Sequence, residues 1–332
     1  MHFKRFIFLI IAVCFFACNN SNEEAKINSI QKDTIKPSLT LYAAPDTSEL
    51  KNDDWGKMVK YGLLLVKNTA YYIGLNGTVS KNLGNKMNCT NCHLENGTKP
   101  FGVNFFNSHK TYPQYRARED KILSLADRVN NCIERPHNGK PLKLDCKEMI
   151  AIISYIKWVG EKYNTELHEG HGIKYVDFKG LTADSKRGEN VYKTHCASCH
   201  QTNGEGKLNL ENTTYTYPPL WGKTSYQEGS SMHRVIKAAS FIKYNMPNTV
   251  TWQNPTLTDQ EALDVAAFVN DGRIHERPKP SSKIISYPNT HTKPIDYFKG
   301  PYNDTFTEEQ HTFGPWDAII GYYEAKGLKI HK

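Results

Sequence analysis

The sequence has only one long apolar run and no segment of low complexity. The run covers residues 6–17, which is too short and too close to the N-terminus for a membrane-spanning helix, so a polytopic membrane protein is excluded. Neither sign of charge dominates: the formal net charge is +8, and nothing else in the sequence indicates nucleic-acid binding. With 39% hydrophobic and 23% charged residues, most of the 332-residue chain is expected to fold, and it is long enough for two domains.

The N-terminal segment has the pattern of a bacterial export signal. Two basic residues are followed by an apolar stretch, and Ala17 precedes Cys18 in a loose lipobox. We therefore expect residues 1–17 to be a lipoprotein signal peptide and Cys18 to be lipidated, with an ordinary secretory signal as the alternative. Either signal places the mature protein outside the cytoplasm. We predict a membrane-anchored lipoprotein of the periplasm.

Four of the eight cysteines form two identical motifs, Cys89-Thr90-Asn91-Cys92-His93 and Cys196-Ala197-Ser198-Cys199-His200. Cys-x-x-Cys-His is the attachment signature of haem c: the two thiols add to the haem vinyl groups and the histidine coordinates the iron. A zinc site would need further Cys/His pairs, and a redox dithiol would not need the histidine twice. The sequence predicts two covalently attached haem c groups.

The chain repeats one plan twice, which predicts an all-α fold with two tandem cytochrome c domains. Each unit opens with a glycine-containing helix (55–73 and 185–193), continues through its motif and an irregular loop, and closes with an amphipathic helix (147–159 and 259–269). Thr258 is the expected N-cap of the last of these helices. The predicted boundaries are a tether at 18–50, domain 1 at 51–164, a linker at 165–183, domain 2 at 184–275, and at 276–332 an extended tail that wraps the domains.

The second axial ligand of a low-spin haem c usually comes from the loop before the closing helix. In the second unit that loop contains Met246, followed by Pro247, as is common for a methionine ligand. Met232 is the reserve candidate, and a methionine in the core is the alternative.

In the first unit a cysteine stands where the second has its methionine. Aligning the closing helices by Tyr155 and Phe268 places Cys132 one residue from the equivalent of Met246. A thiolate ligand would lower the haem potential and leave a sulfur nucleophile at the metal. A disulfide between Cys132 and Cys146 is the alternative, and spacing alone does not decide between them.

The segment around Cys132 is rich in positive charge. Residues 99–144 contain nine Lys or Arg and only four Asp or Glu. A solvated basic face is one interpretation. Clustered arginines beside a haem-bound thiolate also suit a small oxyanion substrate, because guanidinium groups bind such anions at two points.

Several motifs resemble the thiosulfate dehydrogenase family of dihaem c-type cytochromes, from about residue 55 onward. They are residues 88–94 with 97–101, Arg128-Val129-Asn130-Asn131-Cys132, Asn138-Gly139-Lys140, Pro218-Pro219-Leu220-Trp221-Gly222, Asn245-Met246-Pro247, and in the tail 293–296 and 300–302.

The resemblance implies His93 and Cys132 as ligands of a catalytic first haem, and His200 and Met246 as ligands of a second haem that relays electrons. Arg118 and Arg128 fall at the family's substrate-binding arginine positions, and Lys140 is a further candidate. One departure is Pro136, where the family pattern has serine after Arg135.

The implied reaction is the oxidation of two thiosulfates to tetrathionate, or the reverse, with electrons leaving to a soluble or membrane-associated acceptor such as another cytochrome c. A dihaem electron carrier without its own substrate is the main alternative, and a dihaem peroxidase is a second.

Overall fold

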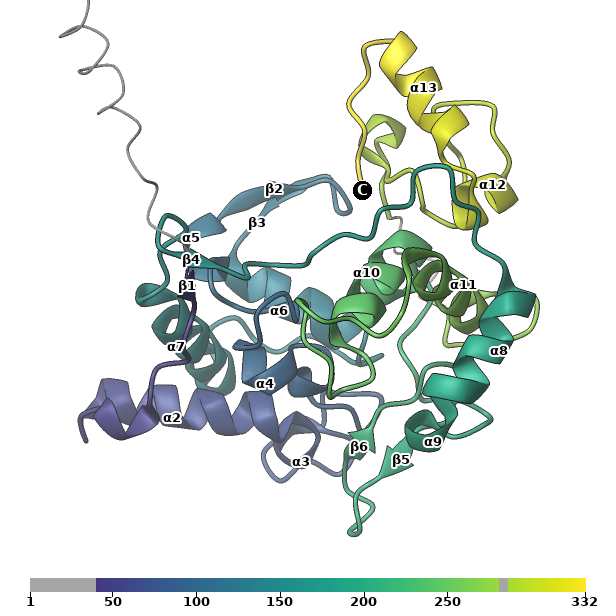
Figure 1. Ribbon diagram of the computed structural model, residues 1–332. Coiled ribbons are helices and arrows are strands. Elements are labelled where there is room, and N and C mark those ends of the chain that lie inside the picture. The colour runs from purple at the N-terminus through teal and green to yellow at the C-terminus, as the bar shows by residue number, and fades with distance from the viewer. Residues whose placement is uncertain (1–39, 281–285) are drawn as a thin grey trace, which may run out of the picture. The chain divides into compact units, whose positions relative to one another are not determined.

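The structure, a computed structural model, consists mainly of helices joined by irregular loops (Figure 1). It describes residues 40–280 and 286–332, which belong to one folded unit. The predicted signal peptide, Cys18 and most of the predicted tether lie outside the described residues. Within the described ranges, no helix has both the length and the apolarity to cross a membrane.

Domain 1 is organised around the crossing of α2 (Asp54–Lys67) and α7 (Lys147–Glu161). Gly62 permits this crossing, because a Cβ atom there would lie 2.0 Å from the carbonyl oxygen of Ala151. The predicted opening helix, 55–73, is interrupted at Asn68, after which α3 (Thr69–Ile73) begins. The closing helix lies where it was predicted, two residues longer at its C-terminal end.

Domain 2 repeats the arrangement with α8 (Ser185–His195) and α11 (Asp259–Asn270). A Cβ atom on Gly188 would lie 1.9 Å from the carbonyl oxygen of Asp264. The predicted cap is confirmed: the Thr258 hydroxyl accepts from the Glu261 N–H at 3.2 Å, and the Glu261 carboxylate accepts from the Thr258 N–H at 2.9 Å. The two glycine contacts are equivalent, which supports the alignment that paired Cys132 with the region of Met246.

The strands are short and, within residues 40–280 and 286–332, form three two-stranded ribbons. The pairs are β1 (Thr40–Leu41) with β4 (His168–Glu169), parallel; β2 (Gln114–Arg116) with β3 (Lys121–Leu123), antiparallel; and β5 (Lys207–Leu208) with β6 (Tyr215–Tyr217), antiparallel. The remaining helices before the tail are η1 (Thr47–Glu49), η2 (Cys89–Asn91), α4 (Leu94–Gly97), α5 (Ser108–Thr111), α6 (Leu125–Glu134), α9 (Ala197–His200), η3 (Ser231–His233) and α10 (Val235–Asn245).

Two predicted connecting segments are more ordered than expected. Residues 40–50 were assigned to the tether, yet Tyr42 is buried against Phe106 and its hydroxyl donates to the Val159 carbonyl. In the predicted linker, Val176 and Phe178 belong to the core of domain 2. Both segments contain aromatic or aliphatic side chains that gain more from burial than they lose in chain entropy.

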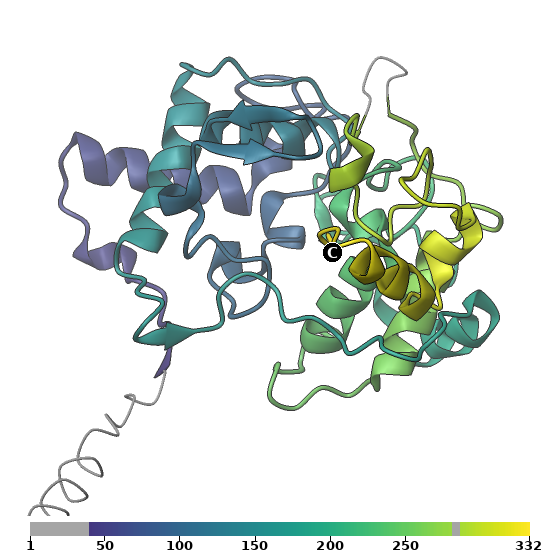
Figure 2. The same ribbon diagram turned by 90° about the horizontal axis from the view of Figure 1, so that it is seen from above.

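The tail packs largely on domain 2 and is not extended throughout, because it contains η4 (Thr290–Thr292), α12 (Glu308–Phe313) and α13 (Asp317–Ala325). Trp316 and Ile319 are fully buried in the core of domain 2, and Figure 2 shows α13 (yellow) beside the green helices of that domain. A buried ion pair joins the tail to α10, with the Arg234 Nε 2.8 Å from an Asp296 carboxylate oxygen.

The two domains are bonded to each other beside the first motif. The Asn88 side chain donates to the Thr214 hydroxyl at 2.6 Å, and the Lys86 ammonium donates to the Asn212 carbonyl at 2.7 Å. The Tyr215 N–H in turn donates to the Lys86 carbonyl at 3.3 Å. Domain 2 therefore covers one side of the first Cys-x-x-Cys-His segment.

Candidate functional site

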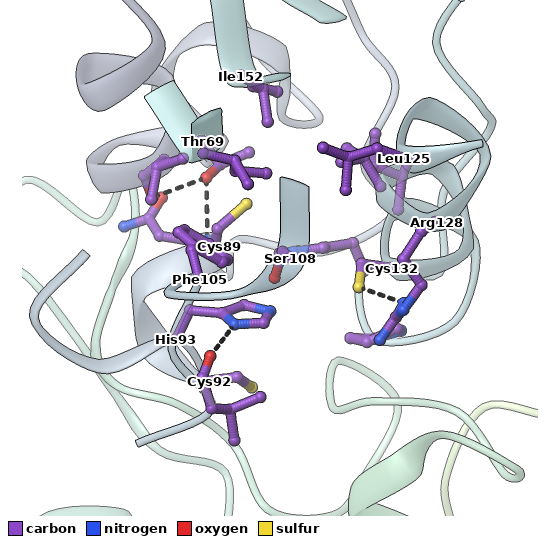
Figure 3. Close-up of a pocket in the computed structure, with 18 of the residues that line it drawn as sticks. Thr69, Cys89, Cys92, His93, Phe105, Ser108, Leu125, Arg128, Cys132 and Ile152 are labelled. Atoms are coloured by element: carbon purple, nitrogen blue, oxygen red, sulfur yellow. Dashed lines mark hydrogen bonds between the residues drawn. The ribbon is translucent and has the colours of Figure 1, made fainter. Parts of the chain in front are cut away.

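A cavity of about 190 Å³ in domain 1 brings together the residues of the first motif. Its wall contains Cys89, Cys92, His93 and Cys132. Most of the remaining lining is apolar, and half of it comes from α2, α3, α6 and α7. Figure 3 shows the His93 ring and the Cys132 sulfur facing each other across the pocket. Two thiols and an adjacent histidine in a largely apolar pocket are what haem c attachment requires, and a sulfur opposite the histidine is a suitable second ligand, so these residues fit the group.

Both motif histidines are held in the tautomer that iron coordination needs. The Nδ1 of His93 bonds the Val103 carbonyl, and the Nδ1 of His200 bonds the Pro218 carbonyl at 2.8 Å. A carbonyl accepts only from N–H, so Nδ1 carries the proton and Nε2 keeps its lone pair. Phe105 lies against the His93 ring, with the ring centroids 4.7 Å apart.

Cys132 lies on α6, where the sequence had suggested an irregular loop. Ser124 caps this helix in a capping box with Asp127, and that signal is readable in the sequence. Cys132 and Cys146 are both free, so the structure does not contain the disulfide considered above. Cys146 is the N-cap residue of α7 and packs against the core of domain 1.

The thiol of Cys132 differs electrostatically from those of the motif. Burial disfavours its thiolate, but the positive charge of the nearby Arg128 is the main effect that outweighs burial and lowers the pKa of Cys132 to about 6. The Arg128 Nη1 donates to the Cys132 sulfur at 3.0 Å, one helical turn away. Burial instead raises the pKa of Cys89 to about 11 and that of Cys92 to about 12. Cys132 is therefore the thiolate of this pocket.

A second, smaller hollow of about 30 Å³ adjoins Cys132 and is lined by four arginines. They are Arg116, Arg118, Arg128 and Arg135. Arg118 and Arg128 were predicted here, whereas Arg116 and Arg135 were counted only as part of the basic segment. Arg128 on α6 and Arg135, the C-cap residue of that helix, are seven residues apart and so lie on the side of Cys132, a signal that the sequence did contain. Lys140 is exposed and lines neither cavity, so the structure does not place it in the site.

One acidic side chain moderates this cluster of positive charge. Glu119 lines the hollow, forms an ion pair with Arg135 and accepts from the Asn131 amide at 3.1 Å. Arg118, Arg116 and Arg128 are not ion-paired within the described ranges. Pro136, the departure from the family pattern, lines both cavities, and its carbonyl accepts from the Asn85 amide at 2.8 Å.

Two residues near this hollow come from distant parts of the chain and were missed by the sequence analysis. Tyr287 of the tail donates its N–H to the Arg118 carbonyl at 2.8 Å, and the Arg118 Nε donates to its hydroxyl at 3.4 Å. Lys237 on α10 donates to the Tyr175 hydroxyl at 2.9 Å. Burial and the charge of Arg234, with smaller contributions from Arg116 and Arg128, lower the pKa of Lys237 to about 8.

In domain 2, Met246 follows the last residue of α10 and is half-buried. Met232 packs in a small cluster with Met87, Tyr215 and Tyr226, between the domains. Met246 as the ligand opposite His200 stays a prediction.

Comparison with known proteins adds independent information. A family model for cytochrome c matches residues 185–272, and one described as SoxA/TsdA, cytochrome c domain, matches residues 80–163. The chain is 34% identical over 255 residues to the thiosulfate dehydrogenase of Psychrobacter arcticus, and the matched region covers 76% of this chain and 73% of that protein. It is also 34% identical over 242 residues to the thiosulfate dehydrogenase of Stutzerimonas stutzeri, covering 72% and 74%. The chain belongs to the thiosulfate dehydrogenase family.

Among solved structures, a thiosulfate dehydrogenase (TsdBA) from Marichromatium purpuratum superposes with a TM-score of 0.65 at 31% identity. The match covers 73% of this chain and 51% of that one, so this chain spans about half the length of the solved protein. Two cytochrome c domains in a thiosulfate dehydrogenase family member, each with its attachment motif, indicate two covalently bound haem c groups.

Proposed function

We propose that the protein oxidises two thiosulfates to tetrathionate and two electrons, or runs the same reaction in reverse. The observation that carries this proposal is the hollow in which four arginines surround the sulfur of Cys132. A dianion is strongly attracted to such a hollow, and guanidinium groups bind sulfonate oxygens at two points.

The residues divide the work as follows. Arg118 and Arg128 bind the anions, with Arg116 and Arg135 completing the hollow. The Cys132 thiolate forms a bond with the sulfane sulfur of one thiosulfate, and two electrons leave. The second thiosulfate then attacks that sulfane sulfur, which releases tetrathionate and restores the thiolate. When bound, haem supplies the acceptor for these electrons, with His93 and Cys132 holding the first group and His200 and Met246 the second.

We also propose an exported protein, anchored through Cys18 to a membrane and working in the periplasm of a bacterium. The N-terminal sequence pattern supports this proposal, as does the attachment of haem c outside the cytoplasm in bacteria. The electrons would leave to a soluble or membrane-associated acceptor, such as another cytochrome c. We further propose that the tail wraps both domains, which the contact between Tyr287 and Arg118 supports.

Steady-state thiosulfate oxidation with an artificial electron acceptor tests the function, together with the reverse assay on tetrathionate. Turnover in either direction is expected from the purified protein with both haem groups attached, as verified by mass spectrometry. A protein with both groups attached and no turnover in either direction would instead be an electron carrier.

A further inference from the structure

Arg277 is a buried arginine without a counter-charge. It lies just after α11 and is 7% exposed. Its Nη2 donates to the Val269 carbonyl at 2.7 Å, but its Nε and Nη1 have no partner among the described residues. A guanidinium cannot lose its charge in a protein. Burying it without a counter-charge is therefore strongly unfavourable, because its lost hydration is not replaced.

The surroundings of Arg277 lie between the two domains. Its guanidinium carbon is 4.5 Å from the centre of the Tyr226 ring. Tyr226 packs in the same cluster as Met87, and Met87 lines the cavity of domain 1. On the other side, the carbonyl that Arg277 binds belongs to α11 of domain 2.

Other buried polar atoms without partners gather in the neighbouring segments. Residues 225–230 run beside two other segments. The Glu228 N–H donates to the Pro278 carbonyl at 2.8 Å, which joins them to 276–278. The Asn138 amide donates to the Ser225 carbonyl at 2.6 Å, which joins them to 134–138. The unpartnered atoms in these three segments and at their edges are His137 Nδ1, Asn138 Oδ1, Gln227 Oε1, Ser230 Oγ, His275 Nε2 and the two nitrogens of Arg277. Buried polar groups are normally hydrogen-bonded, so these atoms call for further partners. The amide oxygens of Asn138 and Gln227 need donors such as water, whereas the nitrogens of Arg277 need an acceptor.

The chemistry of the two nitrogens specifies that group. Nε and Nη1 lie on different edges of the guanidinium, and a carboxylate at either edge would neutralise the charge and accept from the nitrogen on that edge. Each haem c carries two propionate carboxylates, and the cavity beside the first attachment motif borders this region through Met87. We propose that Arg277 binds a propionate carboxylate of one of the two haem groups. The proposal rests on the two-haem assignment and is independent of the thiosulfate reaction.

This contact has a redox consequence. A positive charge beside a haem disfavours the oxidised iron, which is the more positive state, and so raises the reduction potential. Arg277 would therefore act as a positioning residue that binds a propionate and raises the potential of that haem.

The test compares three variants of the haem-loaded protein by spectroscopic redox titration and by resonance Raman bands of the propionate groups. Arg277→Gln removes the charge, and Arg277→Lys keeps the charge but not the two-edged geometry. Arg273→Gln is the matched control, because Arg273 is exposed and paired with Asp271 and Glu309.

We expect Arg277→Gln to lower the potential of one haem and to shift a propionate band, while Arg273→Gln changes neither. The haem whose potential falls is the source of the propionate. Arg277→Lys should shift the propionate band while keeping most of the potential, and this variant decides the matter if Arg277→Gln does not fold. Unchanged potentials and propionate bands in the folded Arg277 variants would overturn the proposal.

Discussion

At the scale of single residues, the environment of a sulfur decides its chemistry. The chain places three cysteines in one cavity, yet only Cys132 has an arginine donating to its sulfur. Cys89 and Cys92 are buried without such a partner, so their thiols stay protonated at neutral pH until they react. One cavity thus contains two protonated thiols suited to haem attachment and one thiolate, to which the proposed mechanism gives iron ligation and sulfur transfer.

Replacing each unassigned cysteine tests this division. Cys132→Gly should leave both haem groups attached, because Cys89, Cys92 and His93 remain, but should raise the potential of the first haem and abolish thiosulfate turnover. Cys146→Gly should retain turnover and the spectrum of the first haem. Absorption spectra and steady-state assays check both variants. Full turnover in Cys132→Gly would remove the sulfur-transfer mechanism.

The pH dependence of substrate affinity should reveal the protonation state of Lys237. Because its pKa is lowered to about 8, Lys237 is charged below that pH and neutral above it. A positive charge close to Arg116 and Arg128 favours anion binding, so KM for thiosulfate should rise as the pH passes about 8. In Lys237→Met, KM should already be high at pH 7 and lose this dependence. An identical pH profile in the variant and the parent protein would contradict the assignment.

The sequence alone identified several candidate residues of the site, but not which distant segments of the chain meet there. The two attachment motifs were found because each depends on spacing within a short segment. Cys132 was suggested by the alignment of the two units and favoured by the family resemblance. Arg116 joins the site only through the pairing of β2 with β3, and Tyr287 and Lys237 join it through contacts more than 100 residues away in the sequence. Such long-range packing leaves no periodic signal in a single sequence.

At the scale of elements, a glycine in each opening helix sets how closely the helices cross. Apolar residues at helical spacing predicted the two closing helices, and the Thr258 cap predicted the start of the second. The opening helices were predicted from the repeated plan, and their N-caps, Asp53 and Asp184, were not. The interruption at Asn68 was not predicted, because residues 69–73 continue the apolar pattern in a separate helix. The helix α6 was missed although its capping box is present.

Substitution at Gly188 tests how closely α8 and α11 cross. Gly188→Ala should destabilise domain 2 by about 1–3 kcal/mol, since its Cβ would overlap the Asp264 carbonyl and force the helices apart. Gly321→Ala is the matched control: it also lies within a helix, α13, but its Cβ would meet no atom within 4 Å. That control should gain about 0.5–1 kcal/mol. Thermal or denaturant unfolding of the haem-loaded protein compares them, and equal effects at both positions would refute the close crossing.

At the scale of the whole molecule, the tail fixes domain 2 through a buried charge pair and an apolar core contact. Arg234 is 5% exposed and Asp296 is 1% exposed, so neither charge can be solvated if its partner is lost. The tail also reaches domain 1, where Tyr287 bonds to Arg118. It thereby connects the stability of domain 2 with the geometry of the hollow that the four arginines line.

Removing one partner should therefore be costly. Asp296→Ala should destabilise the protein by about 3–5 kcal/mol, because it leaves the Arg234 guanidinium buried and unpaired. The double variant Arg234→Met with Asp296→Leu should recover most of this loss, since it removes both charges. Denaturant unfolding gives the free energies. A single variant that unfolds like the parent protein would show that the pair is solvated in solution.

The bonds between the domains also impose an order on the maturation of the protein. Asn88 precedes the first motif and bonds to Thr214 of domain 2. Asn91 lies between the two cysteines of that motif and bonds to the Tyr215 carbonyl. Thioether formation at Cys89 and Cys92 needs this segment to be free and accessible to the attachment machinery. The first haem must therefore be joined to the chain before the β5–β6 ribbon docks, and a chain that folds completely before attachment has closed its own site.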